Sequence, residues 1–304
     1  MPEILVVGSL NADLVVRAPR FPQPGETISG EDLQVIPGGK GANQAAAAAR
    51  LEASVSLLGR VGKDNFGDFL LDNLRSNHVD TTMIQRDDAS TGTAIIVVDS
   101  NGQNSIVLSA GANGKVSVLD VENASFSRFN LLLLQLEIPT PTVLRAAQRA
   151  RENRLRVILN PAPAQPIPDE LIALSDFIIP NETELCLLTN QTVTDIQSAK
   201  KAAHVLLQSG AQNVIVTLGS KGVLVVSSTQ AVHIDTFTVN VVDTTAAGDA
   251  FIGGFATALL ENKSLEESAR HGCACGALAT TKFGAQPSLP TKAEVDIFMS
   301  LRAA

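Results

Sequence analysis

Short apolar runs that recur along the chain constrain its fold more than any other feature. Six of these runs are rich in Val, Ile and Leu, and helix-like stretches lie between most of the six. They cover residues 4–8, 54–58, 131–136, 157–160, 177–179 and 214–218. Continuous runs such as Leu131 to Leu134 suit strands that are buried on both faces of a parallel sheet. The pattern predicts an α/β fold, in which a central, mostly parallel sheet carries helices on both faces as a three-layer αβα arrangement.

Helix-like segments and chain length extend this prediction. The segments with helical composition are 42–50, 195–208, 249–261 and 264–282. A chain of 304 residues, of which 45% are apolar, can bury a sizeable core but is short for two full domains. We therefore expect one domain spanning residues 1–304, with a small appendage.

Four segments break the rhythm of strand and helix. Residues 12–17 and 32–36 alternate like half-exposed strands. Residues 93–99 and 104–108 flank Asn101-Gly102, a strong signal for a tight hairpin turn. We expect the four to form a small lid sheet over a site at the carboxyl ends of the main strands, with an edge extension as the alternative. Because such a sheet has exposed edges, we also expect a homodimer formed through it.

Composition argues against several classes of partner. A formal net charge of −8 and singly scattered basic residues argue against nucleic acid, and the absence of Trp and Tyr argues against extensive base stacking. The longest apolar run is too short for a membrane span, and no basic leader precedes Ile4, so we expect a cytoplasmic protein without a membrane partner. Cys186, Cys273 and Cys275 are odd in number and lack C-x-x-C spacing, which favours free buried thiols.

Residues 38–45, which read GGKGANQA, lead directly into an alanine-rich helix. Glycines here allow close backbone approach, while the N–H groups of the helix face a ligand. The segment is not a dinucleotide fingerprint, because Gln44 stands where the third glycine should be, and no Walker loop occurs in the chain. A nicotinamide-dependent dehydrogenase is therefore disfavoured. A polar cradle and a plain turn both remain open, and Lys40 can also be a solvated lysine at a helix start.

Residues 242–255, which read VDTTAAGDAFIGGF, place small residues before a second helix. The free N–H groups and dipole of such a helix start attract anions such as phosphate. A carboxylate at Asp249 would repel that phosphate unless it has another task, and accepting a proton from an attacking hydroxyl is such a task. The alternative is an acidic residue that only complements the helix dipole.

Polar or glycine-rich motifs close the remaining predicted strands. They are GSLNAD (8–13), QLE (135–137), NPAPA (160–164), PNETE (180–184) and TLGSKG (217–222). Because the carboxyl ends of parallel strands meet at one edge of a sheet, we expect these motifs to assemble one site there. Each motif alone could be a turn or a cap, and Asn181 with Glu184 fits a capping box equally well.

From Gly8 to about Ser288 the chain resembles the ribokinase family of carbohydrate kinases. Both family signatures, GGKGANQ and DTxAAGD, are present in the right order and separation. The resemblance implies transfer of the γ-phosphate of ATP to the 5-hydroxyl of a small sugar, D-ribose above all, with magnesium (Mg2+) and a monovalent cation (K+) as cofactors.

The resemblance also implies roles for matched positions, with Asp249 as the catalytic base. The sugar-binding set is Asn11, Asp13, Gly39, Lys40, Asn43, Glu137 and Asp249. The nucleotide side is Asn181, Thr217, Gly219, Ser220, Gly222, Gly248, Asp249 and Cys273. Cys273 departs from the family pattern, since a close relative carries a larger polar side chain there, and this puts the adenine contact in doubt.

Metal ligands follow from the same resemblance. The positions that match a monovalent cation site are Asp243, Thr245, Ala279, Lys282, Gly284 and Ser288. Several of these act through backbone carbonyls, so the Lys282 ammonium can point away from the ion. Glu184 is expected to act on Mg2+ through water.

Two alternatives to a D-ribose kinase stay open. A related kinase for another sugar or a nucleoside is one, although Asn11-Ala12-Asp13 together with GGKGANQ favours ribose. A sugar sensor that kept the fold without the chemistry is the other, and the intact Gly248 and Asp249 argue against it.

Overall fold

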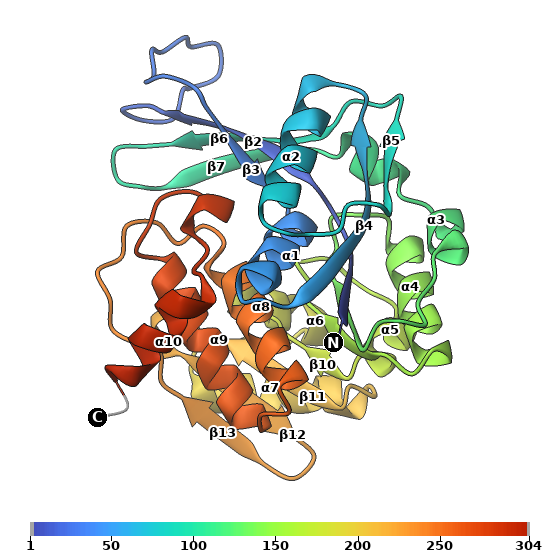
Figure 1. The fold of residues 1–304 in the computed structure, drawn as a ribbon. Helices are drawn as coiled ribbons and strands as arrows, with labels where there is room; N and C mark the ends of the chain where they lie inside the picture. Colours follow the sequence, from blue (N-terminus) through green and yellow to red (C-terminus); the bar gives the residue numbers. More distant parts are fainter. Residues whose placement is uncertain (1–2, 303–304) are drawn as a thin grey trace.

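The computed structural model describes residues 3–302 and contains two sheets (Figure 1). In the main sheet the strand order is β13-β12-β11-β10-β9-β8-β1-β4-β5, and all neighbours from β11 to β5 are parallel. The strands are β1 (Glu3–Val7), β4 (Ser54–Gly62), β5 (Ile84–Asp87), β8 (Leu131–Leu134), β9 (Arg156–Leu159), β10 (Phe177–Ile178), β11 (Asn213–Thr217), β12 (Val223–Ser227) and β13 (Ala231–Ile234). Since only β12 and β13 join antiparallel, the predicted mostly parallel sheet is confirmed.

The apolar runs form strands because their side chains enter two cores. In β8, Leu132 and Leu134 pack into the core on one face of the sheet, while Leu131 and Leu133 pack into the core on the other. All four side chains are fully buried. Burying one leucine contributes roughly 1.5–3 kcal/mol, which explains why the run tolerates no polar alternation.

Helices cover both faces, which confirms the three-layer prediction (Figure 1). One layer holds α1 (Lys40–Arg50), α2 (Asn65–Ser76), α8 (Ala247–Leu260) and α9 (Leu265–Ala279), with α10 (Lys292–Ser300) packed on α9. The other holds α3 (Val118–Asn123), α4 (Thr140–Glu152), α5 (Asp169–Ala173), α6 (Glu182–Thr189) and α7 (Ile196–Gln208). The predicted helix over 264–282 ends at Ala279, and the one predicted from 249 begins at Ala247.

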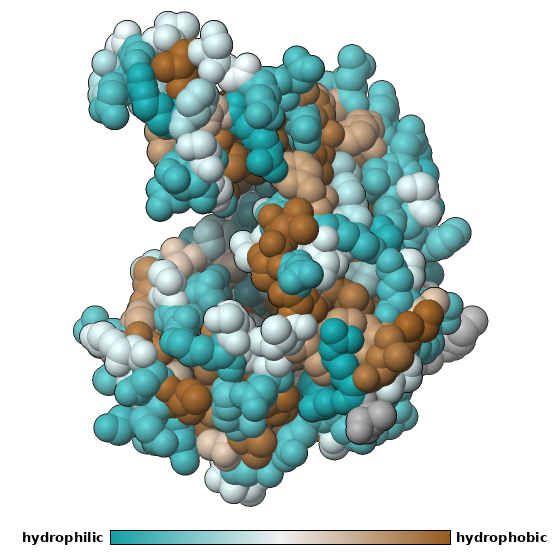
Figure 2. Space-filling view, turned by 90° about the vertical axis from the view of Figure 1, so that its left-hand side faces the viewer, coloured by the Kyte–Doolittle hydropathy of each residue, from teal (hydrophilic) through white to brown (hydrophobic). Residues whose placement is uncertain are grey.

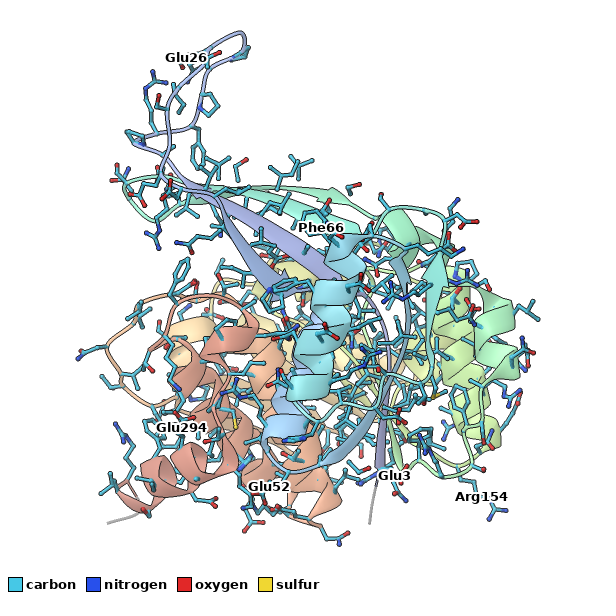
Figure 3. The ribbon with its side chains drawn as sticks, turned by 45° about the horizontal axis from the view of Figure 1, so that its top comes forward. Glu3, Glu26, Glu52, Phe66, Arg154 and Glu294 are labelled. Carbon is cyan, nitrogen blue, oxygen red and sulfur yellow. The ribbon has the colours of Figure 1, made fainter. Side chains whose placement is uncertain are left out.

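The four irregular segments form the second sheet, called here the lid sheet. Its strands are β2 (Asn11–Arg17), β3 (Gln34–Gly38), β6 (Gly92–Val98) and β7 (Asn104–Ser109), in the order β3-β2-β6-β7. The expected hairpin joins β6 to β7, and Asp99 accepts hydrogen bonds from the backbone N–H groups of Asn101 and Gln103. Figure 3 shows the β2–β3 connection, with Glu26 near its tip, rising away from the body.

Three further features complete the description. Single turns of 3-10 helix lie at η1 (Gly111–Lys115), η2 (Gly219–Lys221) and η3 (Gln286–Ser288). The three cysteines are free as predicted, although Cys186 is only partly buried. Between residues 3 and 302, no helix has the length and apolar character needed to cross a membrane.

Candidate active site

The polar strand ends meet beneath the lid sheet, where the surface is deeply hollowed (Figure 2). A hollow of about 270 Å³ has Asp13 on its lid side and Asp243 and Thr245 on its body side. A second hollow of about 510 Å³ is bordered by Asn11 and Glu137. Both hollows border strand β2, and from here on the two together are called the cleft. The sequence prediction of a site at this edge of the main sheet agrees with this placement.

Asp249 lies beside Asn43 and Gln44 because α1 and α8 touch almost at backbone level. A Cβ atom added at Gly253 would lie 2.5 Å from the Cβ of Ala47, so a larger residue there would push the helices apart. This close approach lets Asn43 and Gln44 bond to a residue more than 200 positions later. Asn43 Nδ2 donates to Asp249 Oδ2 at 2.9 Å, and Gln44 Nε2 donates to Asp249 Oδ1 at 3.0 Å.

The start of α8 leaves room for an anion beside this carboxylate. Ala246 precedes the helix in the left-handed conformation, at φ 59°, and Asp249 lies in the first turn. Gly248 is exposed, with open space where a side chain would stand. The N–H groups of a first helical turn have no intrahelical partner and attract negative charge. Asp249 therefore lies in the same first helical turn whose N–H groups can attract an anion.

Glu137 joins the GSLNAD and GGKG segments at the border of the second hollow. Its Oε2 atom accepts hydrogen bonds from Ser9 Oγ at 2.6 Å and from the Lys40 N–H at 3.0 Å. Asn11 Nδ2 lies 3.4 Å from the same oxygen. Gly39 precedes α1 at φ 87°, and a Cβ atom there would lie 2.6 Å from the backbone nitrogen of Asn11. Only glycine fits this position, so the GGKG segment forms a cradle against β2 rather than a plain turn.

Charges in this cluster act strongly on one another. Burial first, and then the nearby Glu137 and Asp249 carboxylates, raise the pKa of Asp13 to about 7, while Lys40 opposes them. Burial works to lower the pKa of Lys40, but the surrounding carboxylates, Asp249 first, outweigh it and raise the pKa. The Lys40 ammonium therefore stays charged among acidic neighbours instead of facing bulk solvent. Hydroxyl groups, which both donate and accept, suit such a mixture of carboxylates, amides and one ammonium.

Asn43 also presents an unused acceptor. Its Oδ1 atom is buried and accepts no hydrogen bond from residues 3–302, whereas its Nδ2 atom is bonded to Asp249. Buried polar atoms are nearly always paired in folded proteins. A ligand hydroxyl in the cleft is therefore a fitting donor for this atom.

The predicted nucleotide residues lie on a neighbouring stretch of the same sheet edge. Thr217 ends β11 and pairs with Asn181 in an isolated bridge. The turn that follows carries Gly219 at φ 58°, the exposed Ser220 and Gly222 at φ 89°. The structure brings these positions together at the end of the strand.

Asn181 and Glu184 form the capping box that the sequence left open. Asn181 Oδ1 accepts from the Glu184 N–H at 2.8 Å, and Glu184 Oε2 accepts from the Asn181 N–H at 2.8 Å. Burial nevertheless raises the pKa of Glu184 above its ordinary value. The carboxylate is thus a cap whose charged form burial disfavours, although Lys40 and the Asn181 N–H partly offset this.

Cys273 is placed differently from the rest of the nucleotide set. Its thiol packs in the apolar core with Ile215 and Val225 and is 5% exposed. Burial raises its pKa to about 12, so it stays a neutral thiol. The structure shows its side chain contributing to the core, and its adenine contact stays a prediction.

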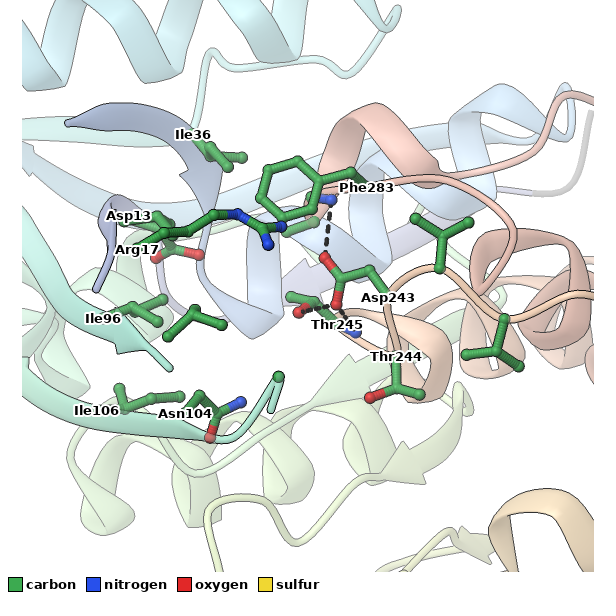
Figure 4. A pocket seen from close by; sticks show the side chains of 17 residues that line it. Asp13, Arg17, Ile36, Ile96, Asn104, Ile106, Asp243, Thr244, Thr245 and Phe283 are labelled. Carbon is green, nitrogen blue, oxygen red and sulfur yellow. Dashed lines mark hydrogen bonds between the residues drawn. The ribbon is translucent and has the colours of Figure 1, made fainter. Parts of the chain in front are cut away.

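Asp243 brings part of the predicted cation set together (Figure 4). Its carboxylate accepts hydrogen bonds from the N–H of Thr245 at 2.9 Å, the Thr245 hydroxyl at 2.7 Å and the N–H of Gly284 at 2.9 Å. Lys282 bonds to Glu294 at 2.6 Å, so its ammonium is held by another partner. The remaining two positions, both buried, are Ala279 and Ser288.

Several polar residues that bond to the predicted set, or to Gln44 behind it, were not predicted from sequence. They are the buried side chains of Ser9, Gln44, Asn113, Gln135 and Asn160. Asn113, for example, fixes the amide of Asn11 by donating to its Oδ1 at 2.7 Å. All but Asn113 lie inside motifs that the sequence singled out, so membership in a strand-end motif was the available signal.

Comparisons with known proteins agree with this geometry. Residues 1–292 match the family described as pfkB family carbohydrate kinase. The chain is 47% identical over 299 residues to the ribokinase of Haemophilus influenzae, covering 97% of this chain and 98% of that protein. It is 38% identical to the deoxyribokinase of Salmonella typhi, covering 98% and 99% respectively. The structure of Arabidopsis thaliana ribokinase complexed with ribose and ATP matches with a TM-score of 0.91 at 36% identity, covering 98% of each chain.

Proposed function

Since the chain belongs to the pfkB family of carbohydrate kinases, and is therefore a phosphotransferase acting on a hydroxyl group, we propose that it phosphorylates the 5-hydroxyl of D-ribose with ATP. The observation that carries the proposal is the buried Asp249 carboxylate in the first turn of α8, hydrogen-bonded to Asn43 and close enough to Asp13 and Lys40 to act on their charges. The likeness to a ribokinase complexed with ribose and ATP supports the choice of both substrates. ATP as donor also favours the cytoplasm as the place of action.

Proton transfer is the proposed task of Asp249. As the sugar oxygen forms its bond to the γ-phosphorus, the bond from that phosphorus to the bridging oxygen of ADP breaks, and the hydroxyl proton passes to the carboxylate. The N–H groups around Gly248 face the charge on the transferring group, because they have no partner within the helix. Asn43 and Gln44 hold the carboxylate in place through their hydrogen bonds.

Sugar recognition is proposed for the residues around Glu137. Asn11, Asp13 and Asn43 offer amide and carboxylate groups, and the Lys40 ammonium offers donors only. A site built to bond several hydroxyls rejects analogues that lack one of them, because a buried polar group is then left unpaired. The open Oδ1 atom of Asn43 is such a group.

Magnesium and a monovalent cation, with K+ as our choice, are proposed as cofactors, and the donors present fit both. Glu184 is a buried carboxylate whose pKa burial raises, and a water-bridged Mg2+ would offset that burial by favouring the charged form. Asp243 and the backbone oxygens of the 279–288 segment are hard oxygen donors, and Lys282 is turned toward Glu294. When bound, Mg2+ would neutralise phosphate charge.

A homodimer through the lid sheet is also part of the proposal. Ile95, Ile106, Val107 and Leu108 are between 49% and 63% exposed, on β6 and β7. Neighbouring side chains on a strand point to opposite faces, so both faces are apolar, as a sheet that a second copy covers would be. Sedimentation of Val107→Lys tests this. A wild-type dimer and a monomeric variant are expected, whereas a wild-type monomer at micromolar concentration contradicts the proposal.

The experiment that tests the reaction measures ADP release from ATP and magnesium with a panel of acceptors. The panel holds D-ribose, 2-deoxy-D-ribose, fructose, ketodeoxygluconate and adenosine, each with potassium or with sodium. Ribose-dependent, potassium-stimulated turnover is expected. Turnover that prefers 2-deoxyribose or another acceptor would keep the kinase and replace ribose. Failure of every acceptor, with ribose still bound in calorimetry, would favour a sugar sensor.

A further inference from the structure

Behind Asp249 lies a series of buried amide side chains, those of Gln44, Gln135 and Asn160. Gln44 is fully buried, and its Nε2 atom donates both to Asp249 Oδ1 at 3.0 Å and to Asn160 Oδ1 at 3.2 Å. Its Oε1 atom accepts from Gln135 Nε2 at 2.6 Å. Asn160 in turn donates to the carbonyl of Ile179 at 3.0 Å. Gln44 therefore uses both ends of its amide inside the protein.

The direction of these bonds is fixed by chemistry. If the Gln44 amide were turned over, its oxygen would face the oxygens of Asp249 and Asn160, and its nitrogen would face the donor of Gln135. An ionised carboxylate offers only acceptors, so that arrangement pairs like with like on every side. The Gln135 and Asn160 bonds thus hold the Gln44 N–H groups toward Asp249.

We propose that Gln44 is a positioning residue for phosphoryl transfer, which anchors Oδ1 of Asp249 and so aims its Oδ2 atom at the sugar hydroxyl. The inference rests on the proposed function, in which Asp249 accepts the proton. Within residues 3–302 the one hydrogen bond to Oδ2 comes from Asn43, whose own Oδ1 atom is free to accept from the same ligand. One carboxylate oxygen is therefore held by the protein interior, while the other meets the substrate.

A purely structural role would leave different traces. Gln44 has no exposed surface, so it cannot contact the sugar or the nucleotide. Any change in turnover must then pass through Asp249, whereas a loss of packing would lower stability and affect all ligands alike. Loss of an N–H donor also makes a carboxylate hold its proton more tightly, which shows in the pH dependence of the rate.

The test compares Gln44→Met with Gln135→Met and with the matched control Gln148→Met. The Gln148 side chain, on α4, accepts a hydrogen bond from Arg145 and donates one to Glu170, away from Asp249. For Gln44→Met we expect kcat to fall on the order of 10- to 100-fold, because a small misplacement of a reacting group costs about that much. The ribose Kd from calorimetry should stay near the wild-type value. The acid limb of the kcat/KM profile should move to higher pH.

Gln135→Met keeps the Gln44 bond to Asp249 and removes only its support, so it should show the same changes at smaller size. It also decides the question if Gln44→Met fails to fold. Normal kcat and a normal acid limb in a folded Gln44→Met, or in Gln135→Met alone, would overturn the inference. So would a loss of ribose binding in parallel with kcat.

Asp249→Asn in the same assays separates this inference from the proposed function. If Asp249→Asn keeps turnover, Asp249 is not the base, and both claims fall together. If Asp249→Asn loses turnover while the Gln44 and Gln135 variants behave like Gln148→Met, the base assignment stands and only the role of Gln44 is overturned.

Discussion

The two sheets of this molecule are built from similar apolar residues but bury them very differently. In the main sheet, β8 is buried along its whole length, between two helical layers. In the lid sheet, every residue of β7 is exposed, and Val107 is 63% exposed. Burial, rather than strand composition, therefore distinguishes the two sheets. The main sheet is enclosed between helices, whereas the lid sheet leaves apolar surface open, where we propose that a second copy packs.

Few contacts tie the lid sheet to the body across the cleft. Val15 and Ile36 pack against Ala285 in a small apolar cluster. Arg17 lies over the ring of Phe283, with 4.8 Å between its guanidinium carbon and the ring centroid (Figure 4). Phe283 sits next to Gly284, whose N–H bonds to Asp243. The strand that carries two of the proposed sugar ligands, Asn11 and Asp13, thus rests on the loop proposed to bind the cation.

The largest effect is expected at the body side of the site. Asp249→Asn should lower kcat by roughly 100- to 10,000-fold, because the proton acceptor is lost while the sugar contacts remain. Steady-state kinetics with ribose, together with circular dichroism, would check this. Asp68→Asn, on the exposed face of α2, is the control for removing one carboxylate. Turnover that stays near wild type in Asp249→Asn would contradict the assignment of Asp249 as the proton acceptor.

Substitutions of apolar side chains should lower the free energy of unfolding more in the main sheet than in the lid sheet. Leu133→Ala is expected to cost about 2–5 kcal/mol in the free energy of unfolding, since its side chain is fully buried. Ile95→Thr in the lid sheet should cost less than about 1 kcal/mol, because half of its side chain already meets water. Urea unfolding would measure both. A cost for Ile95→Thr that equals the Leu133→Ala cost at every protein concentration would contradict the comparison.

Sugar affinity should depend on pH through Asp13, on the lid side. With its pKa raised to about 7, this carboxyl is largely protonated at pH 6 in the free protein and largely ionised at pH 8. Sugar hydroxyls donate more strongly to the ionised form, so ribose should bind up to about tenfold more weakly at pH 6 than at pH 8. Calorimetry at both values would show it. Asp13→Asn should bind weakly at both, without this slope.

The raised pKa of Asp13 also predicts how the stability of the protein depends on pH. Above pH 7 the folded protein holds an ionised Asp13 carboxylate in an acidic, buried place, and this destabilises it relative to the unfolded chain. The penalty is absent below about pH 4, where the carboxyl is protonated in both states. Asp13→Asn should therefore raise the Tm by a few degrees at pH 8 and leave it nearly unchanged at pH 4. The reverse trend would contradict the buried-charge account.

The smallest effect is expected where the two sheets meet. A double-mutant cycle with Arg17→Ala and Phe283→Leu should give a coupling of about 0.5–1 kcal/mol in ribose binding, the usual size for an exposed cation–π pair. We expect the single variants to change KM for ribose more than kcat. A coupling of zero would show that the lid sheet rests on the body without help from this pair.

Much of the fold was predictable because its signals are local. Each apolar run marked a strand, and Asn101-Gly102 marked the hairpin of the lid sheet. The antiparallel edge strands β12 and β13 were not predicted, since Val223–Ser227 gives the same apolar signal whichever direction its partner runs. The helices at 65–76 and 140–152 were not singled out either. Their periodicity is amphipathic, but no functional motif drew attention to it.

The sequence alone determined which residue types stand at the ends of the strands, and hence the chemistry the cleft could hold. Only the tertiary structure decided how those residues act on one another. Gly253 lets α1 and α8 approach, so Asn43 and Gln44 reach Asp249 from 206 and 205 residues away. The raised pKa of Asp13 likewise depends on burial and on the charges of Glu137 and Asp249. Separation along the chain does not by itself fix whether two residues meet in space, and hydrogen bonds and charges respond only to the distance in space.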